Sequence, residues 1–445
     1  MSQKQDSLVN AGLDRATVEA MSALKNEPAW LRTLRLEAHA AFENIPMPTL
    51  QDEEWRRTDV RGLRLNDLVP FAVPAARVAS VASLPEDLRR QTVSGDQTGG
   101  LLVQQDAANV FSSLGANFAE KGVIFCDLDT AVREHGDLVQ RYLAKAVPAE
   151  YSKFGALNTA FWSGGVFLYV PRGVEVGLPL QAVTWLAQDG LSNFSHTVIV
   201  AEPDSDVVLI DSWASPDQSK PAISANVEEI YVGQGARVRY VTLQEWGRHV
   251  WNFSINRAEL SRDSSYNSLV VAFGGRFHKA NVETALQGPG ASGEMLGVLC
   301  GDQRQFFDHH TLQDHAAHHT SSDLLYKGTL TGRARSVFSG LIHARKSAQK
   351  TDAIQTNRNL LLSDGSRADS IPNLEIEAND LRCTHAATIA PVDDEQMFYL
   401  RARGLTEIDA KRAIVEGFFE PVLARIPLEG VVERLRQTIS GKIGD

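Results

Sequence analysis

The chain has 445 residues, 43% of them hydrophobic and 22% charged, with a formal net charge of −11. A chain of this length exceeds what one ordinary hydrophobic core supports, so we expect several domains or an elongated repeat. The acidic balance argues against sequence-independent nucleic-acid binding, in which Lys and Arg neutralise phosphates.

The first residues contain no apolar segment after a basic one, and no window of the sequence approaches the roughly 18 apolar residues of a membrane-spanning helix. The three cysteines, Cys126, Cys300 and Cys383, are too few and too far apart for a disulfide framework. We therefore expect a cytoplasmic protein with reduced thiols and no membrane partner.

Residues 1–150 are expected to form a mostly helical or mixed N-terminal region. Apolar residues recur at helical spacing between about residues 14 and 45, and Pro46 ends that pattern. The pattern from residue 51 to 150 is mixed and predicts no single type of element.

Residues 151–390 are expected to form a β-rich core, because short runs of Val, Ile, Leu, Phe, Tyr and Thr alternate with small polar turns. The turn centres are separated by 30, 29, 26, 44 and 32 residues. They lie at Ser205, Gly235, Ser264, Gly290, Ala334 and Ser366. A period near 30 predicts a parallel β-helix with about three short strands per coil. The gap of 44 predicts an insertion, which contains "FDHHTLQDHAAHHTSSD".

Residues 391–445 are expected to be helical again. Asp393 with Gln396 indicates a helix start, Gly404 a helix end, and Thr406 with Asp409 a second start. The second helix carries a broad apolar stripe, so we expect this helical tail to rest on the end of the β-helix or on a partner. The stripe consists of Ile408, Ile414, Val415, Phe418, Phe419, Val422 and Ile426.

The segment "GPGASG" at 288–293 matches the glycine fingerprint of dinucleotide-binding proteins. That fingerprint requires a helix to begin at the last glycine, but the following residues continue as a strand. We interpret the segment as a turn of the repeat.

The densest group of potential metal ligands lies in the expected insertion. Imidazoles and carboxylates bind Zn, Fe, Ni or Cu, and His315 with His318 or His319 could share a helix face. The alternative is a solvated loop without a specific site. The group comprises Asp308, His309, His310, Asp314, His315, His318 and His319.

Cys383 and His385 are two residues apart in a strand-like run. Residues at this spacing point to one face of a strand, so thiolate and imidazole could bind one metal or cluster. Two ligands do not complete a site, and the remaining donors would come from another coil or another chain. The alternative is a small buried hydrophobe beside a packed imidazole.

Long stretches of the chain resemble the SufB/SufD family of the Suf iron–sulfur cluster assembly system. They are "EPAWLRTLRLEAHAAFENIPMPTLQDEEWRRTD", "ALNTAFWSGGVFLYVPRGVEVGLPLQ", "SSDLLYKGTLTGRARSVFSGLIHARKSAQKTDAIQTNRNLLLSD" and "PNLEIEANDLRCTHAATIAPVDDEQMFYLRARGL". The resemblance implies a right-handed parallel β-helix between helical ends. It also implies a partner, SufB or SufD, bound through the β-helix, and a SufC ATPase bound to the C-terminal helices near Phe418 and Phe419.

Within the family, the chain is most similar to SufD. SufB subunits carry a scaffold cysteine at the position of Thr356 and Glu-His-Glu at the positions of Thr384, His385 and Ala386. This chain lacks that cysteine and both glutamates. The stretch from Trp55 to Asp59 is also similar to SufD.

The resemblance implies a non-catalytic subunit that pairs with SufB and SufC. It implies no cofactor bound by the isolated chain and a transient Fe–S cluster at the SufB interface, with His385 and Cys383 as site residues. An isolated chain could also form a homodimer through the same edge. The alternative function is a stand-alone β-helix metalloenzyme that uses the His-rich insertion to activate water.

Overall fold

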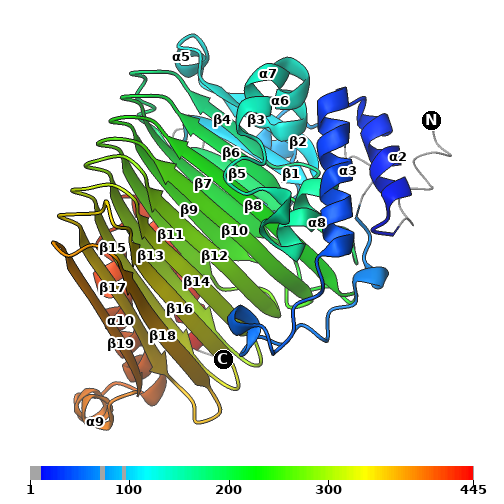
Figure 1. Cartoon of the computed structure of the whole chain (residues 1–445). Coiled ribbons are helices and arrows are strands. Elements are labelled where there is room, and N and C mark those ends of the chain that lie inside the picture. Colours follow the sequence, from blue (N-terminus) through cyan, green and yellow to red (C-terminus); the bar gives the residue numbers. More distant parts are fainter. Residues whose placement is uncertain (1–11, 71–75, 93–96, 444–445) are drawn as a thin grey trace.

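The computed structural model describes residues 12–70, 76–92 and 97–443. Two large sheets dominate it, and the strands of each sheet are stacked one after another along the same axis (Figure 1). One sheet has ten strands in the order β19-β17-β15-β13-β11-β9-β7-β5-β1-β2, and the other has nine in the order β18-β16-β14-β12-β10-β8-β6-β4-β3. The ten-stranded sheet consists of β1 (Gly100–Gln105), β2 (Ala108–Leu114), β5 (Leu180–Trp185), β7 (Asp206–Ala214), β9 (Arg237–Glu245), β11 (Ser265–Ala272), β13 (Ser292–Gly301), β15 (Ser321–Leu330), β17 (Asp352–Leu361) and β19 (Arg382–Pro391). The nine-stranded sheet consists of β3 (Ile124–Asp127), β4 (Val166–Val170), β6 (His196–Ala201), β8 (Ala222–Val232), β10 (Val250–Leu260), β12 (Phe277–Leu286), β14 (Phe306–His315), β16 (Arg335–Ala344) and β18 (Arg367–Ile376).

From β4 to β19 the chain alternates between the two sheets, so each coil contributes one strand to each sheet. Strands of successive coils pair in parallel, and β15, β17 and β19 keep one register over ten residues. The predicted mainly β fold with a parallel β-helix is confirmed. The expectation of three strands per coil is wrong, because each coil has two longer strands.

The predicted insertion is also wrong, because the six turn centres belong to two series. Gly290 precedes a strand of the ten-stranded sheet, as do Ser205, Gly235 and Ser264, whereas Ala334 and Ser366 precede strands of the nine-stranded sheet. The next turn in the series of Gly290 lies at His319, just before β15. The His-rich segment is therefore the regular strand β14 and the turn that follows it.

The space between the sheets is filled by alternate side chains of each strand. Met295 of β13, Leu324 of β15 and Phe338 of β16 belong to one buried cluster that joins both sheets. Each coil buries its apolar residues only by stacking on its neighbours, which is the physical reason for the repeat. Side chains at the positions in between face outward from the solenoid.

Several helices of the N-terminal half, α2 (Arg15–Lys25), α3 (Ala29–Asn44), α6 (Leu128–Glu134), α7 (Gly136–Tyr142) and α8 (Lys153–Phe161), cover the outer face of the nine-stranded sheet (Figure 1). The predicted helical run is confirmed as α2 and α3, separated by the left-handed residue Asn26. With α8 they bury a cluster that includes Phe253 of β10 and Phe277 of β12. Two further short helices are α4 (Glu86–Arg89) and α5 (Ala116–Ala119). Three strands that precede residue 150, β1, β2 and β3, extend both sheets.

The C-terminal helices are α9 (Asp394–Ala402), α10 (Glu407–Leu423) and α11 (Glu429–Ile443). The predicted starts and end are confirmed: Asp393 accepts a hydrogen bond from the amide of Gln396, and Thr406 accepts one from that of Asp409. Gly404 has a φ of 97°, which a residue without Cβ adopts freely. Buried residues of α10 and α11 pack on the outer face of the ten-stranded sheet, so the expectation that they rest on the end of the β-helix is wrong.

Among the helices of the described residues, none combines the length and the apolar character needed to cross a lipid bilayer.

Candidate functional site

The last coil of the solenoid, β18 and β19, has no coil beyond it in the described chain. Each strand is the terminal member of its sheet, so one edge of its backbone is unpaired. Leu374 and Ile376 of β18 and Ile389 of β19 are 39–41% exposed, although they continue columns that are buried in the preceding coils. Ile342, the register partner of Leu374, is completely buried. The structure therefore presents two long strand edges and an interior of mixed apolar and polar side chains at one open end.

Cys383 and His385 lie on β19 at this open end. Their register partners on β17 are Ala353 and Gln355, which are both completely buried. Because register partners in a parallel ladder point to the same face, the thiol and the imidazole both point inward. The prediction that they share one face is confirmed, whereas their role as metal ligands stays a prediction.

The two side chains differ in their surroundings. Cys383 is half-buried, and burial raises the pKa of its thiol, with a further contribution from the Asp352 carboxylate. The thiolate is the form that binds metal, so the raised pKa weakens Cys383 as a ligand in the isolated chain. His385 is exposed. The open end thus offers two donors, one of them mostly protonated, and does not form a closed ligand set.

The His-rich segment does not form one site, because the alternation of β14 divides its side chains. His309 points inward, where its ring lies 5.7 Å from that of Tyr326 and 5.1 Å from that of His278. His315 also points inward, and its two ring nitrogens lie 2.8 Å from the hydroxyls of Thr320 and Ser322. Burial lowers the pKa of both His309 and His315 to about 4, so both imidazoles are neutral packing residues.

Other members of the segment point outward. Asp308 pairs with Lys279 at 2.8 Å and accepts a hydrogen bond from Thr58 at 2.6 Å. Although burial opposes it, Lys279 and His310 together hold the pKa of Asp308 far below its usual value. This buried network fixes the segment around Thr58 to the sheet.

The remaining members lie apart from these. Asp314 is paired with Arg345, and His318 and His319 lie in the turn after β14. The predicted shared helix face of His315 with His318 or His319 is wrong, because His315 ends a strand. A site for a stand-alone metalloenzyme therefore does not assemble from this segment.

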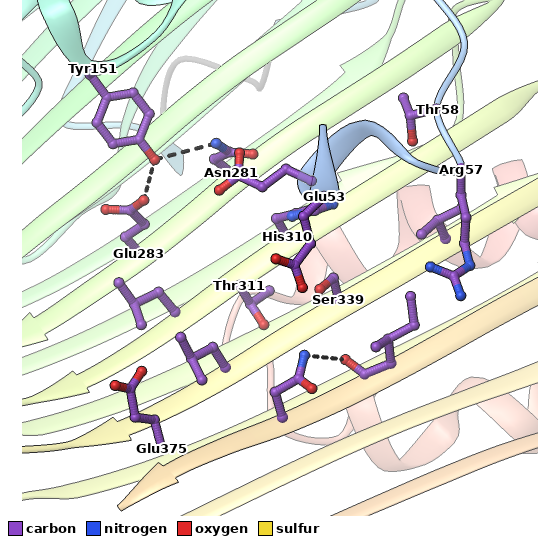
Figure 2. Close-up of a pocket in the computed structure, with 16 residues that line it drawn as sticks. Glu53, Arg57, Thr58, Tyr151, Asn281, Glu283, His310, Thr311, Ser339 and Glu375 are labelled. Carbon is purple, nitrogen blue, oxygen red and sulfur yellow. Dashed lines mark hydrogen bonds between the residues drawn. The ribbon is translucent and has the colours of Figure 1, made fainter. Parts of the chain in front are cut away.

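A cavity of about 500 Å³ lies on the outer face of the nine-stranded sheet, beneath the segment that contains Glu53 and Arg57 (Figure 2). At one end Tyr151 donates a hydrogen bond to Glu283 and lies 3.3 Å from the side-chain amide of Asn281. Burial and the Glu283 carboxylate raise the pKa of the Tyr151 phenol far above its usual value, so it stays a donor.

In Figure 2 the side chain of Glu53 reaches over the strands between His310 and Ser339, and Glu375 lies on β18 of the last coil. This cavity was not predictable from the sequence, because Tyr151 and Glu283, which meet at one end of it, are 132 residues apart. The alternation of residues along each strand indicates which side chains point outward into the cavity. It does not show that residues 53–58 cross over these strands.

A two-sheet parallel solenoid with helices at both ends, and with a thiol and an imidazole on an unpaired last coil, defines a class of parallel β-helix protein. The chain belongs to the SufBD family of iron–sulfur cluster assembly proteins. The family model for the SUF system FeS cluster assembly SufBD core domain matches residues 184–418, and that for the SufBD protein N-terminal region matches residues 18–182.

Curated relatives agree with this assignment. Iron–sulfur cluster assembly SufBD family proteins of Staphylococcus epidermidis, Staphylococcus haemolyticus and Staphylococcus aureus are each 30% identical to this chain. Each alignment covers 97% of this chain and 94% of the relative. The resemblance stated from the sequence is therefore confirmed at the level of the family.

Proposed function

We propose that the chain is a SufD-like, non-catalytic subunit of an iron–sulfur cluster assembly scaffold that acts with SufB and the SufC ATPase. The observation that carries the proposal is the position of Cys383 and His385 on the inner face of β19, at the unpaired end of the solenoid. SufD rather than SufB is favoured by Thr356, Thr384 and Ala386, which stand where SufB carries its cysteine and two glutamates. Thr356 and Ala386 are register partners on β17 and β19, so both differences fall on the last two coils.

The partner surface in this proposal is the edge formed by β18 and β19. Each strand presents ten residues of backbone with one unpaired edge, which is a template for strand addition. The exposed apolar side chains Leu374, Ile376 and Ile389 would be buried by the end of a second solenoid. SufB is the proposed partner, and a homodimer through the same edge is the proposed state of the chain without SufB.

The cluster in this proposal is transient and shared between the two subunits. An iron–sulfur cluster normally takes thiolates and in some cases imidazoles, and this chain supplies one of each at the open end. The raised pKa of Cys383 and the exposure of His385 favour a site that is completed only when the partner adds ligands. Cluster iron and sulfide are cargo, and the isolated chain is expected to hold no cofactor there.

The SufC surface in this proposal differs from the one expected from the sequence. Phe419 is completely buried against the ten-stranded sheet, and the carbonyl of Phe418 accepts a hydrogen bond from Lys327 at 2.6 Å. Phe419 is therefore unavailable to a partner. We assign the ATPase contact instead to Phe398 and Tyr399 of α9 and Ile408 of α10, which are 75%, 57% and 48% exposed.

We also propose a cytoplasmic location. All three cysteines are free in the structure, and free thiols persist in reducing compartments. The alternative function, a stand-alone metalloenzyme, is not favoured, because β14 directs its histidines to opposite faces of the sheet.

The test is cluster reconstitution on a co-purified complex of this chain with SufB and SufC. The variant His385→Ala is expected to lower the amount of cluster at least tenfold while the complex still forms. Thr384→Ala, on the outward face of the same strand, is the matched control and should leave the cluster unchanged. Full assembly in the His385→Ala complex would remove the site assignment.

A further inference from the structure

A row of ligating side chains crosses the outer face of the nine-stranded sheet, on the side opposite to Cys383 and His385. Asp314 of β14, His343 of β16 and Glu375 of β18 are register partners at the ends of three adjacent strands, and Glu377 follows directly after β18. Because neighbouring strands lie roughly 4.8 Å apart, one residue per strand at this row places the side chains within reach of one ion.

Three of these side chains already converge. One ligand atom each of His343, Glu375 and Glu377 lies within 4.8 Å of the other two. The Nε2 atom of His343 lies 3.3 Å from a carboxylate oxygen of Glu377. Its Nδ1 atom lies 3.7 Å from a carboxylate oxygen of Asp314. The Asp314 carboxylate thus lies on the side of the second ring nitrogen, at ion-pair rather than hydrogen-bond distance, where carboxylates commonly orient metal-ligating histidines.

The charges of this cluster are balanced only in part by the protein, through Arg345, which pairs with Asp314 and is also attracted by the Glu377 carboxylate. Asp314 is neutralised by Arg345 through two hydrogen bonds of 2.8 and 2.7 Å. Among the described residues, no lysine or arginine nitrogen lies within 4.0 Å of the carboxylates of Glu375 or Glu377. Two carboxylates without an ion pair to lysine or arginine therefore lie beside an imidazole, and a divalent cation would neutralise them.

The cluster also has access to an open space. Glu375 lines the end of the cavity on this face (Figure 2), so one side of the cluster is accessible to water and small molecules. A metal held by three protein ligands with its other positions toward such a cavity keeps room for water.

We propose that His343, Glu375 and Glu377 bind one divalent first-row transition-metal ion, with Asp314 orienting His343. One imidazole and two carboxylates suit Zn²⁺, Fe²⁺ or Mn²⁺ better than soft Cu⁺, which prefers thiolates. This site is separate from the pair on β19 and does not depend on the proposed role in cluster assembly.

The test uses the full-length chain, freed of metal by a chelator and titrated with Co²⁺ alone under anaerobic conditions. The absorption bands of bound Co²⁺ should saturate at one ion per chain. The double variant Glu375→Gln/Glu377→Gln should weaken binding at least tenfold. Both glutamates are exposed, so the variant should unfold at the wild-type urea concentration.

Two controls locate the ion. The variant Glu53→Gln/Glu54→Gln removes two exposed carboxylates from the opposite wall of the cavity and should bind Co²⁺ as wild type does. Cys383→Ser/His385→Ala should also bind normally. With Mn²⁺ as the probe, nitrogen coupling in the electron spin echo should be present in wild type and absent in His343→Ala. The proposal would be overturned if the glutamate variant bound Co²⁺ with wild-type affinity, or if the Cys383 and His385 variant lost binding. It would also be overturned if the wild-type chain bound no stoichiometric Co²⁺.

Discussion

Gln355 and His385 are register partners on β17 and β19, yet Gln355 is completely buried and His385 is exposed. Both side chains point into the solenoid, and the difference arises because no coil follows β19 to cover the second one. His385 therefore occupies an interior position of the solenoid that the described chain leaves uncovered. This relationship is the basis for the predictions that concern the open end.

Removing the two side chains of the open end should leave the isolated chain stable. His385→Ala and Cys383→Ser remove groups that lack a coil above them, so we expect the free energy of unfolding to change by less than about 1 kcal/mol. Urea unfolding followed by circular dichroism measures this change. A loss of several kcal/mol would mean that these residues are structural, contrary to the site assignment.

A positive charge in the open interior should prevent pairing with SufB. Leu374→Lys/Ile389→Lys places two ammonium groups where a partner would bury apolar side chains, and lysine is a common means of protecting sheet edges. We expect co-purification with SufB to fall at least tenfold while SufC is still retained. Equal recovery of SufB would contradict pairing through β18 and β19.

The reciprocal variant concerns the C-terminal helices. Phe398→Ala/Ile408→Ala removes exposed apolar area from α9 and α10, so SufC binding should weaken at least tenfold and SufB binding should persist. Pull-down of both partners from one preparation measures the two effects together. Loss of both partners would show instead that the variant disturbs the whole chain.

Phe419 should act as a core residue. It is completely buried between α10 and the ten-stranded sheet, so Phe419→Ala should lower the free energy of unfolding by roughly 3–5 kcal/mol. Phe398→Ala, an exposed phenylalanine nearby in the sequence, is the matched control and should change it by less than about 1 kcal/mol. Equal effects of the two substitutions would contradict the packing of α10.

The stability of the fold should depend on pH through the interior carboxyl of Asp211. Burial raises its pKa to about 6, against the lowering effect of hydrogen bonds from Tyr240 and Trp213. Between pH 4, near the ordinary carboxyl pKa, and pH 6, the folded chain binds more protons at this group than the unfolded chain does. The contribution of Asp211 to the free energy of unfolding therefore falls as the pH rises from 4 to 6. Asp211→Asn should flatten the slope of unfolding free energy against pH in that window. An unchanged slope would contradict the raised pKa.

Local features of the fold were predictable from the sequence. The helix starts at Asp393 and Thr406 depend on hydrogen bonds to residues within three positions, so residue type alone indicates them. The shared face of Cys383 and His385 follows from the alternation of a strand in the same way. The repeat near 30 residues was visible because each coil needs the same stacking surface.

Features that depend on chain segments far apart were not predictable. Gly290 and Ala334 both occupy small polar turns, so the sequence did not show that the two turns lie on opposite sides of each coil. The exposure of His385 depends on β19 being the last strand, which is a property of the assembled stack. The cavity and the cluster of His343 with Glu375 and Glu377 depend on register between strands about thirty residues apart.

The central claim, that the open end is the surface completed by a partner, is tested most directly by amide hydrogen exchange. The unpaired backbone amides of β18 and β19 should exchange rapidly in the isolated chain and slow at least tenfold on addition of SufB, because strand pairing protects them. Amides of β8 and β10, in the middle of the nine-stranded sheet, should be unaffected and provide the internal reference. Protection that appears elsewhere in the chain while β18 and β19 exchange as before would contradict the account.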